Sequence, residues 1–171
     1  FDTSSVRDMA WMFNNCWGLT ALDVSKFDTS KVEVMSYMFQ DCSRLTALDL
    51  SGFNTTNVRD MGAMFFDCYN LTELDVSKFN TSKVDNMEGM FAECSNLTTL
   101  DVSNFDTSNV KNMWHMFYNC PRLTTIKGVI DMKSSCTDDN YEGMFENCPK
   151  LTGVKIKNPP ADFESKTGLS S

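Results

Sequence analysis

The sequence has one histidine and no long apolar run, and each shortage excludes a class of site or protein. His115 is the only imidazole, and nothing in the sequence indicates a nucleophile or an acid as its partner, so we expect no catalytic triad. The chain also has no C-x-x-C pair and no D-x-D-x-D-G loop, so we expect neither zinc nor calcium of the EF-hand type. Its apolar runs fall well short of the ~18 residues of a membrane-spanning helix, so we expect no membrane span in this segment.

Basic residues are also scarce, since 15 Lys and Arg stand against 23 Asp and Glu for a net charge of −8. The acidic excess lies in residues 1–104, which hold 15 acidic and 7 basic side chains, whereas residues 105–171 hold 8 of each. Nucleic acids and anionic membranes require a basic surface on the protein. We therefore expect neither as a main partner.

The abundant feature is internal repetition at an unbroken step of 26 residues. The pattern F-x-T-x-x-V-x-x-M-x-x-M-F-x-x-C-x-x-L-T occurs five times, and we number its 26 slots from the first Phe, beginning at Phe1. A fixed period of this length is typical of stacked coils that bury their apolar faces against one another. The predicted coils are 1–26, 27–52, 53–78, 79–104, 105–130 and a degenerate 131–158.

The chain begins inside the repeat, whereas its last residues fall outside the repeat. Because the chain begins inside the repeat, we expect a piece of a longer protein, with any export or anchoring signal outside it. At the other end, Asn158-Pro159-Pro160 stops any strand or helix. We therefore predict a C-terminal tail or linker at 159–171.

Each coil reads as a strand, a turn and a short helix. In 97–102, Leu100 and Val102 are expected to point inward while the side chains between them face solvent. Asp106-Thr107-Ser108 is typical of a helix N-terminus. The apolar residues that follow recur at helical spacing and predict a helix of about ten residues, held only by stacking. In this coil they are Val110, Met113, Met116, Phe117 and Cys120.

The whole pattern, extended through L-D-V-S, resembles the 26-residue BspA-type leucine-rich repeat of bacterial surface proteins and mycoplasma lipoproteins, over about residues 1–157. The resemblance implies an α/β repeat fold: a leucine-rich-repeat solenoid of about six coils, with one parallel sheet and short helices on the opposite face. Members of that family are typically secreted or surface-anchored, and several are regarded as adhesins. The resemblance therefore also implies an extracellular or cell-surface location, and the family has no catalytic motif to transfer to this chain.

The sulfur-containing residues are interpreted mainly as core. Six of seven cysteines share the sixteenth slot, where equivalent residues of neighbouring coils lie about 5 Å apart, within disulfide range. We favour a ladder of reduced, buried thiols, because every coil uses the same slot. Cys136 lies off the pattern and is the best candidate for a bridge or a reactive thiol. Eleven of twelve methionines fill two core slots, where contacts with phenylalanines explain them better than metal binding.

A charged column is predicted on the solvent face of the sheet. Its members recur once per coil: Asp23, Asp49, Asp75, Asp101, Lys127 and Lys155. One interpretation is a stripe that binds a cation or a basic partner. The other, which we favour, is that each Asp accepts hydrogen bonds from nearby backbone or from Ser and Thr.

The strongest functional signal comes from large rings in slots that the pattern leaves free, on the predicted helical flank. These are Trp11, Trp17, Tyr37, Phe66, Tyr69, Trp114, His115 and Tyr118. Exposed aromatic residues are typical of recognition surfaces. The alternative is that they pack on the preceding coil or on a flanking domain.

The sequence therefore predicts a non-enzymatic, adhesin-like recognition module that binds a protein or glycan on a host or neighbouring cell, without cofactor or metal. The alternative is a structural spacer or assembly unit that presents other domains. Neither reading assigns an oligomeric state.

Overall fold

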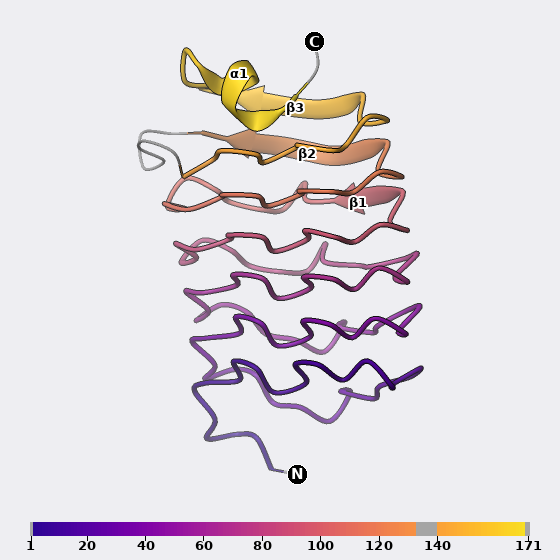
Figure 1. The fold of residues 1–171 in the computed structure, drawn as a ribbon. Coiled ribbons are helices and arrows are strands. Elements are labelled where there is room, and N and C mark those ends of the chain that lie inside the picture. Colours follow the sequence, from indigo (N-terminus) through magenta and orange to yellow (C-terminus); the bar gives the residue numbers. More distant parts are fainter. Residues whose placement is uncertain (1, 133–139, 170–171) are drawn as a thin grey trace.

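The computed structural model describes residues 2–132 and 140–169, and Cys136 lies outside these ranges. The chain runs from the N-terminus to the C-terminus as a pile of coils, each lying on the one before (Figure 1). Hydrogen bonds join equivalent places in successive coils. For example, the N–H of Met9 donates to the carbonyl of Val34 at 2.9 Å, and the N–H of Met35 donates to that of Asp60 at 2.9 Å.

A parallel sheet forms in the later coils. Its strands are β1 (Thr99–Asp101), β2 (Thr125–Asp131) and β3 (Gly153–Lys157), in the order β1-β2-β3. Leu100 and Val102 are buried whereas Thr99 is exposed, so the predicted alternation is confirmed here. A second line of isolated parallel bridges runs through the eighth slot, from Asp8 to Asn112.

The predicted helix on the opposite face is wrong. In each coil this segment is a succession of turns, in which N–H groups donate alternately within the coil and to the next coil. Phe13 donates to the carbonyl of Met38 at 2.9 Å and Phe39 to that of Met64 at 3.0 Å, whereas Cys16 donates back to Phe13 at 3.2 Å. Turns of three residues give apolar positions nearly the same spacing as a helix, which explains the error.

Left-handed backbone positions exclude a helix from these segments. One occurs in the eleventh slot and another in the fifteenth slot of each coil that the structure describes there, with φ between 50° and 63°. Right-handed helices require negative φ throughout, so neither position can belong to one. In the described residues, the one α-helix is α1 (Phe163–Thr167), beyond the last coil.

The core is a set of side-chain columns parallel to the pile. Phe39 stacks on Phe65 with ring centroids 5.8 Å apart and planes within 8°, and the contact recurs from coil to coil. The methionines of the twelfth slot are fully buried beside these rings, except Met12 in the first coil, which is 45% exposed. Each coil therefore supplies one face of a core that only its neighbour completes.

The cysteine column is made of reduced thiols in the described residues, as the favoured interpretation expected. Each buried Sγ donates to the carbonyl of a phenylalanine in the preceding coil, as in Cys68 to Phe39 at 3.1 Å and Cys94 to Phe65 at 3.2 Å. Burial raises the pKa of Cys94 to about 12, so this thiol stays protonated at neutral pH. The column thus contributes weak inter-coil hydrogen bonds as well as apolar volume.

The third-slot threonine joins coils, a role that differs from the predicted helix cap. The hydroxyl of Thr55 donates to the carbonyl of Asn80 at 3.0 Å and accepts from the N–H of Asn80 at 2.7 Å. The same pair of bonds links Thr81 to Asp106. The threonine hydroxyl is buried, so it satisfies a backbone donor and acceptor that water does not reach.

The segment predicted as a tail or linker is packed on the last coil. Phe163 of α1 is buried, and the N–H groups of Gly143 and Phe145 donate to the carbonyls of Lys166 and Thr167 at 2.8 and 2.7 Å. The proline pair ends β3 as expected, but the chain then folds back over the core. This segment supplies the acceptors that a further coil would otherwise provide.

Candidate recognition surface

The eleventh slot of each coil holds a left-handed residue on the turn face. Its occupants are Trp11, Tyr37, Ala63, Gly89, His115 and Gly143, with φ from 50° to 63°. This conformation costs a residue with a side chain roughly 1–2 kcal/mol, and glycine adopts it freely. Two coils have glycine there, whereas three carry a large ring at a position that suits glycine. The three ring-bearing residues therefore adopt a backbone conformation that is unfavourable for any residue with a side chain.

Two of these rings stack across neighbouring coils. Trp11 lies against Tyr37 with centroids 3.9 Å apart and planes within 6°. Farther along the pile, His115 stacks on Trp114 at 3.8 Å and on Tyr118 at 4.5 Å. Between the two groups the slot is filled by small residues. The turn face consequently has two aromatic ridges separated by a depression.

The depression is a cleft of about 160 Å³, which we call the aromatic cleft. It is lined by Tyr37, Gln40, Ala63, Phe66, Glu88, Gly89, Trp114 and His115. The backbone bonds fix their order along the pile: Tyr37 donates to the coil of Ala63, and Gly89 donates to the carbonyl of Trp114 at 2.8 Å. The small residues thus form a floor between rings contributed by the coils on either side.

The aromatic cleft is acidic. Glu88 is its one carboxylate, and its Oε2 accepts a hydrogen bond from Nδ2 of Asn112 at 2.9 Å. Burial, followed by the charges of Glu88 and Asp60, raises the pKa of Tyr37 above its ordinary value. Among the described lining residues there is no Lys or Arg. Its chemistry therefore combines aromatic faces with a fixed negative charge.

The structure brings six of the eight predicted aromatic positions together. Tyr37, Phe66, Trp114 and His115 line the aromatic cleft, and Trp11 and Tyr118 stack behind its rings. Trp17 and Tyr69 are exposed, at 68% and 42%, but do not line it.

Sequence reasoning missed the floor and the charge, namely Ala63, Gly89, Gln40 and Glu88. The signal available was a small residue in the eleventh slot of two successive coils, where other coils carry rings.

On the sheet face, each aspartate of the charged column binds its own turn. The carboxylates of Asp23, Asp49, Asp75 and Asp101 accept from the serine N–H two residues later, at 2.9 to 3.0 Å. Hydrogen bonds from the hydroxyl and N–H of that serine hold the pKa of each carboxyl below its ordinary value. This agrees with the local role that we favoured from the sequence.

The lysine end of the predicted column is broken. Lys127 is the register partner of Asp101 in β1 and β2, but Lys155 in β3 pairs with Val129. The cause is an irregularity in β2 at Gly128, which has φ 111° and passes so close to the backbone of Ser103 that a side chain would collide with it. Bulges shift the register in this way.

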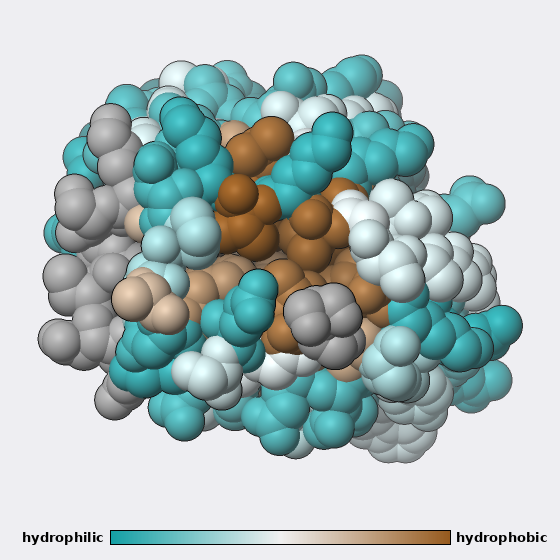
Figure 2. Space-filling view, turned by 90° about the horizontal axis from the view of Figure 1, so that it is seen from above, coloured by the Kyte–Doolittle hydropathy of each residue, from teal (hydrophilic) through white to brown (hydrophobic). Residues whose placement is uncertain are grey.

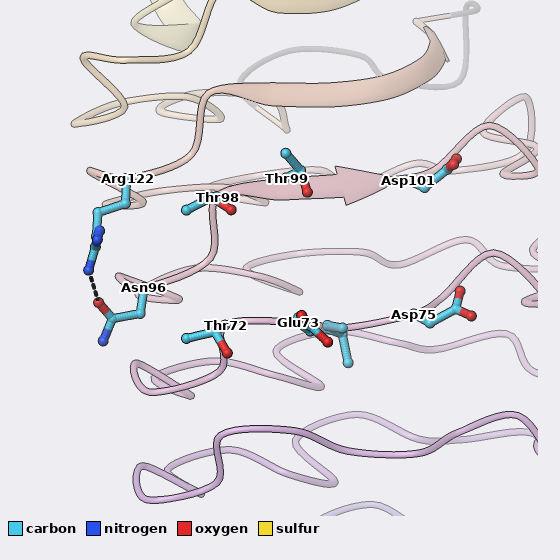
Figure 3. A pocket seen from close by; sticks show the side chains of 9 residues that line it. Thr72, Glu73, Asp75, Asn96, Thr98, Thr99, Asp101 and Arg122 are labelled. Atoms are coloured by element: carbon cyan, nitrogen blue, oxygen red, sulfur yellow. Dashed lines mark hydrogen bonds between the residues drawn. The ribbon is translucent and has the colours of Figure 1, made fainter.

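A polar trough of about 540 Å³ lies beside this column, and residues of three successive coils line it. Figure 3 shows Asp75 and Asp101 at one end and, at the other, the hydrogen bond of 2.9 Å from Arg122 to Asn96. Within 2–132 and 140–169, no group of three or more His, Cys, Asp or Glu could hold a metal ion. The trough is thus an open polar surface in which Asp75 and Asp101 each accept a hydrogen bond from their own turn.

A third surface lies at the end that carries α1. Seen from above, this end shows apolar side chains gathered inside a polar rim (Figure 2). A hollow of about 250 Å³ there is lined in part by Ile156, Pro160, Phe163 and Leu169.

The repeat region matches a known protein family. A model of the family described as "Mycoplasma protein of unknown function, DUF285" matches residues 1–97 and 46–158. The chain belongs to this family. The match confirms the resemblance to BspA-type repeats seen in the sequence.

Among curated proteins none matches the chain. A solved structure of a leucine-rich cell surface protein from Faecalibacterium prausnitzii A2-165 is similar at 15% identity with a TM-score of 0.37. The alignment covers 86% of this chain and 37% of that one. No helix in the described part of this chain is long and apolar enough to cross a membrane.

Proposed function

We propose that this chain is a non-enzymatic recognition module, secreted or displayed at a cell surface, that binds a protein or glycan partner through the aromatic cleft. In this proposal a solenoid of about six coils acts as the rigid support. The observation that carries it is the pair of aromatic ridges around the floor of Ala63 and Gly89. Rings held at left-handed positions outside the core favour a surface role, because packing does not require them there. The BspA-type repeat supports the location.

The surroundings of the titratable groups support the non-enzymatic reading. His115 stacks on two aromatic rings, and no Ser, Thr or Cys side chain is among the described residues that line the cleft with it. The thiols of Cys42 and Cys94 donate to carbonyls, and burial raises the pKa of each to about 12, so they are poor nucleophiles.

A structural role as spacer or assembly unit is the second candidate. The apolar hollow beside α1 favours it, because such a surface at the end of a pile suits end-to-end contact with another domain. The two functions place the important residues on different parts of the molecule, which makes them separable by mutation.

The test compares a triple variant with a double control variant. The first removes two cleft rings and the ring stacked behind them, through Tyr37→Ala, Trp114→Ala and Trp11→Ala. The control removes Trp17 and Tyr69, which are exposed outside the cleft. Binding is measured on immobilised, purified extracellular-matrix proteins and on a glycan array.

We expect the cleft variant to lose binding at least tenfold while the control keeps it. Equal binding by both variants would overturn the proposal. Thermal unfolding of each variant provides the folding check.

A further inference from the structure

We propose that the aromatic cleft binds an arginine side chain presented by an extended segment of a partner protein. This rests on the proposed function above and names the partner chemistry of the same site. The proposal comes from three properties of the aromatic cleft: its braced rings, its carboxylate and its size.

The rings are fixed before any ligand arrives. Tyr37 is braced by Trp11 at 3.9 Å, and Trp114 is braced by His115 at 3.8 Å. Prepositioned rings lose little side-chain entropy on binding. Their faces carry negative electrostatic potential, which attracts a cation, and a planar guanidinium also stacks on them. A ring on each side of the small floor therefore suits a flat, positively charged group.

The carboxylate supplies the matching charge. Glu88 lines the cleft and is oriented by the hydrogen bond from Asn112 at 2.9 Å. A guanidinium offers several N–H donors to a carboxylate, and such charge-assisted hydrogen bonds are stronger than neutral ones. The surrounding segment, residues 1–104, carries the whole net charge of the chain. An approaching basic segment is therefore attracted, whereas phosphate or sulfate groups are repelled.

The size of the cleft favours a side chain over a sugar. At about 160 Å³ it is well below the ~300 Å³ at which small-molecule pockets begin. A sugar ring also presents several hydroxyls that need polar partners, and the lining offers only the polar groups of Tyr37, Gln40, Glu88, Trp114 and His115. Oε1 of Gln40 already accepts from Asn14 at 3.0 Å. A guanidinium, in contrast, can stack on the rings and donate hydrogen bonds to the carboxylate of Glu88.

The test uses two small probes of the same shape, Nα-acetyl-arginine methylamide and its neutral citrulline analogue. The chain is labelled with ¹⁵N, and its three tryptophan indole N–H signals are followed by NMR during titration. We expect the arginine probe to shift the Trp114 signal while leaving that of Trp17 in place. The citrulline probe should bind at least about tenfold more weakly, because it lacks the charge.

Matched variants test the carboxylate. Glu88→Gln keeps the shape and should weaken arginine binding by about tenfold, whereas Glu73→Gln, on the exposed sheet face, should leave it unchanged. Equal binding of citrulline, or arginine binding that is unchanged in Glu88→Gln, would overturn the proposal. If arginine fails but the cleft triple variant still loses a protein or glycan partner, the recognition function stands without it. If neither test shows an effect, both are wrong.

Discussion

The ring of Trp11 lies flat on the ring of Tyr37, with centroids 3.9 Å apart and planes within 6°, although both residues have left-handed backbones. Aromatic pairs of this kind are worth about 0.5–1.5 kcal/mol beyond the area they bury. Replacing Trp11 by Ala should therefore lower the free energy of unfolding by about 1–2 kcal/mol, measured by urea denaturation. Trp17→Ala, with a ring 68% exposed, should change it by less than about 0.5 kcal/mol. If Trp17→Ala lowered the free energy of unfolding more than Trp11→Ala, the exposed fraction of a ring would not predict its contribution to stability.

The left-handed floor of the aromatic cleft predicts opposite effects of two reciprocal substitutions. Ala63, at φ 50°, should gain about 1 kcal/mol of stability when changed to Gly, because the Cβ strain disappears. Gly89→Ala, at φ 55°, should lose a similar amount. A Cβ at Gly89 would lie 3.6 Å from Phe66, an ordinary contact, so backbone strain alone is tested. Chemical denaturation of both variants measures the difference, and effects of the same sign would contradict the reason given.

The buried hydroxyl of Thr55 predicts a sharp distinction between neighbouring threonines. Thr55→Val keeps the shape but removes both hydrogen bonds with Asn80, leaving a backbone N–H and a carbonyl without partners. The cost should be about 1–3 kcal/mol in unfolding free energy. Thr56→Val, one residue later and exposed, is the matched control and should be nearly neutral. Similar costs at the two positions would refute the inter-coil role of the third slot.

The half-buried Asp67 predicts a stability that depends on pH. Burial, a hydrogen bond with Asp41 and the charges of Asp41 and Glu93 raise the pKa of Asp67 to about 6. A folded pKa above the unfolded value means that its favourable contribution is complete below about pH 3.8 and is lost as pH rises through about 6. Asp67→Asn tolerates the left-handed backbone and removes this loss. Its stability relative to the wild type should rise between pH 4 and 6 and then stay constant.

A stability difference that does not change between pH 4 and pH 7 would show that Asp67 is not the titrating group. Asp75→Asn provides a contrast of opposite sign, because hydrogen bonds from Ser77 lower the pKa of Asp75. Its contribution is present above the unfolded pKa and is lost as pH falls through the lower folded value.

The repeat predicted the core well because core slots are occupied by the same residue types in coil after coil. The columns of Phe39, Met38 and Cys68 are buried as the pattern requires. The backbone of the turn face was not predicted, because apolar residues three apart fit both a helix and a series of turns. The fifteenth slot held the missing clue: Asn15 and Asp67 are residue types that tolerate positive φ.

The aromatic cleft was predicted only in part, for a geometric reason. Rings such as Tyr37 and Trp114 stand out in a sequence, so their place outside the repeated core slots could be inferred. The floor and the charge could not be inferred, because Ala63 and Glu88 line a cleft only when neighbouring coils stack and bring the rings of other coils beside them. The break in the lysine column likewise depends on Gly128, where two added residues shift the register of β2.

The alternating hydrogen bonds of the turn face give the pile an electrical direction. Along this segment, N–H groups point toward the next coil and carbonyls toward the preceding one, as in Phe39 to Met64 and Phe65 to Met90, both at 3.0 Å. The peptide dipoles therefore add along the axis of the pile, as they do in a helix. The positive end meets the carbonyls of Lys166 and Thr167. The negative pole lies toward the first coil, so the two directions along the pile are electrically different even though its coils repeat.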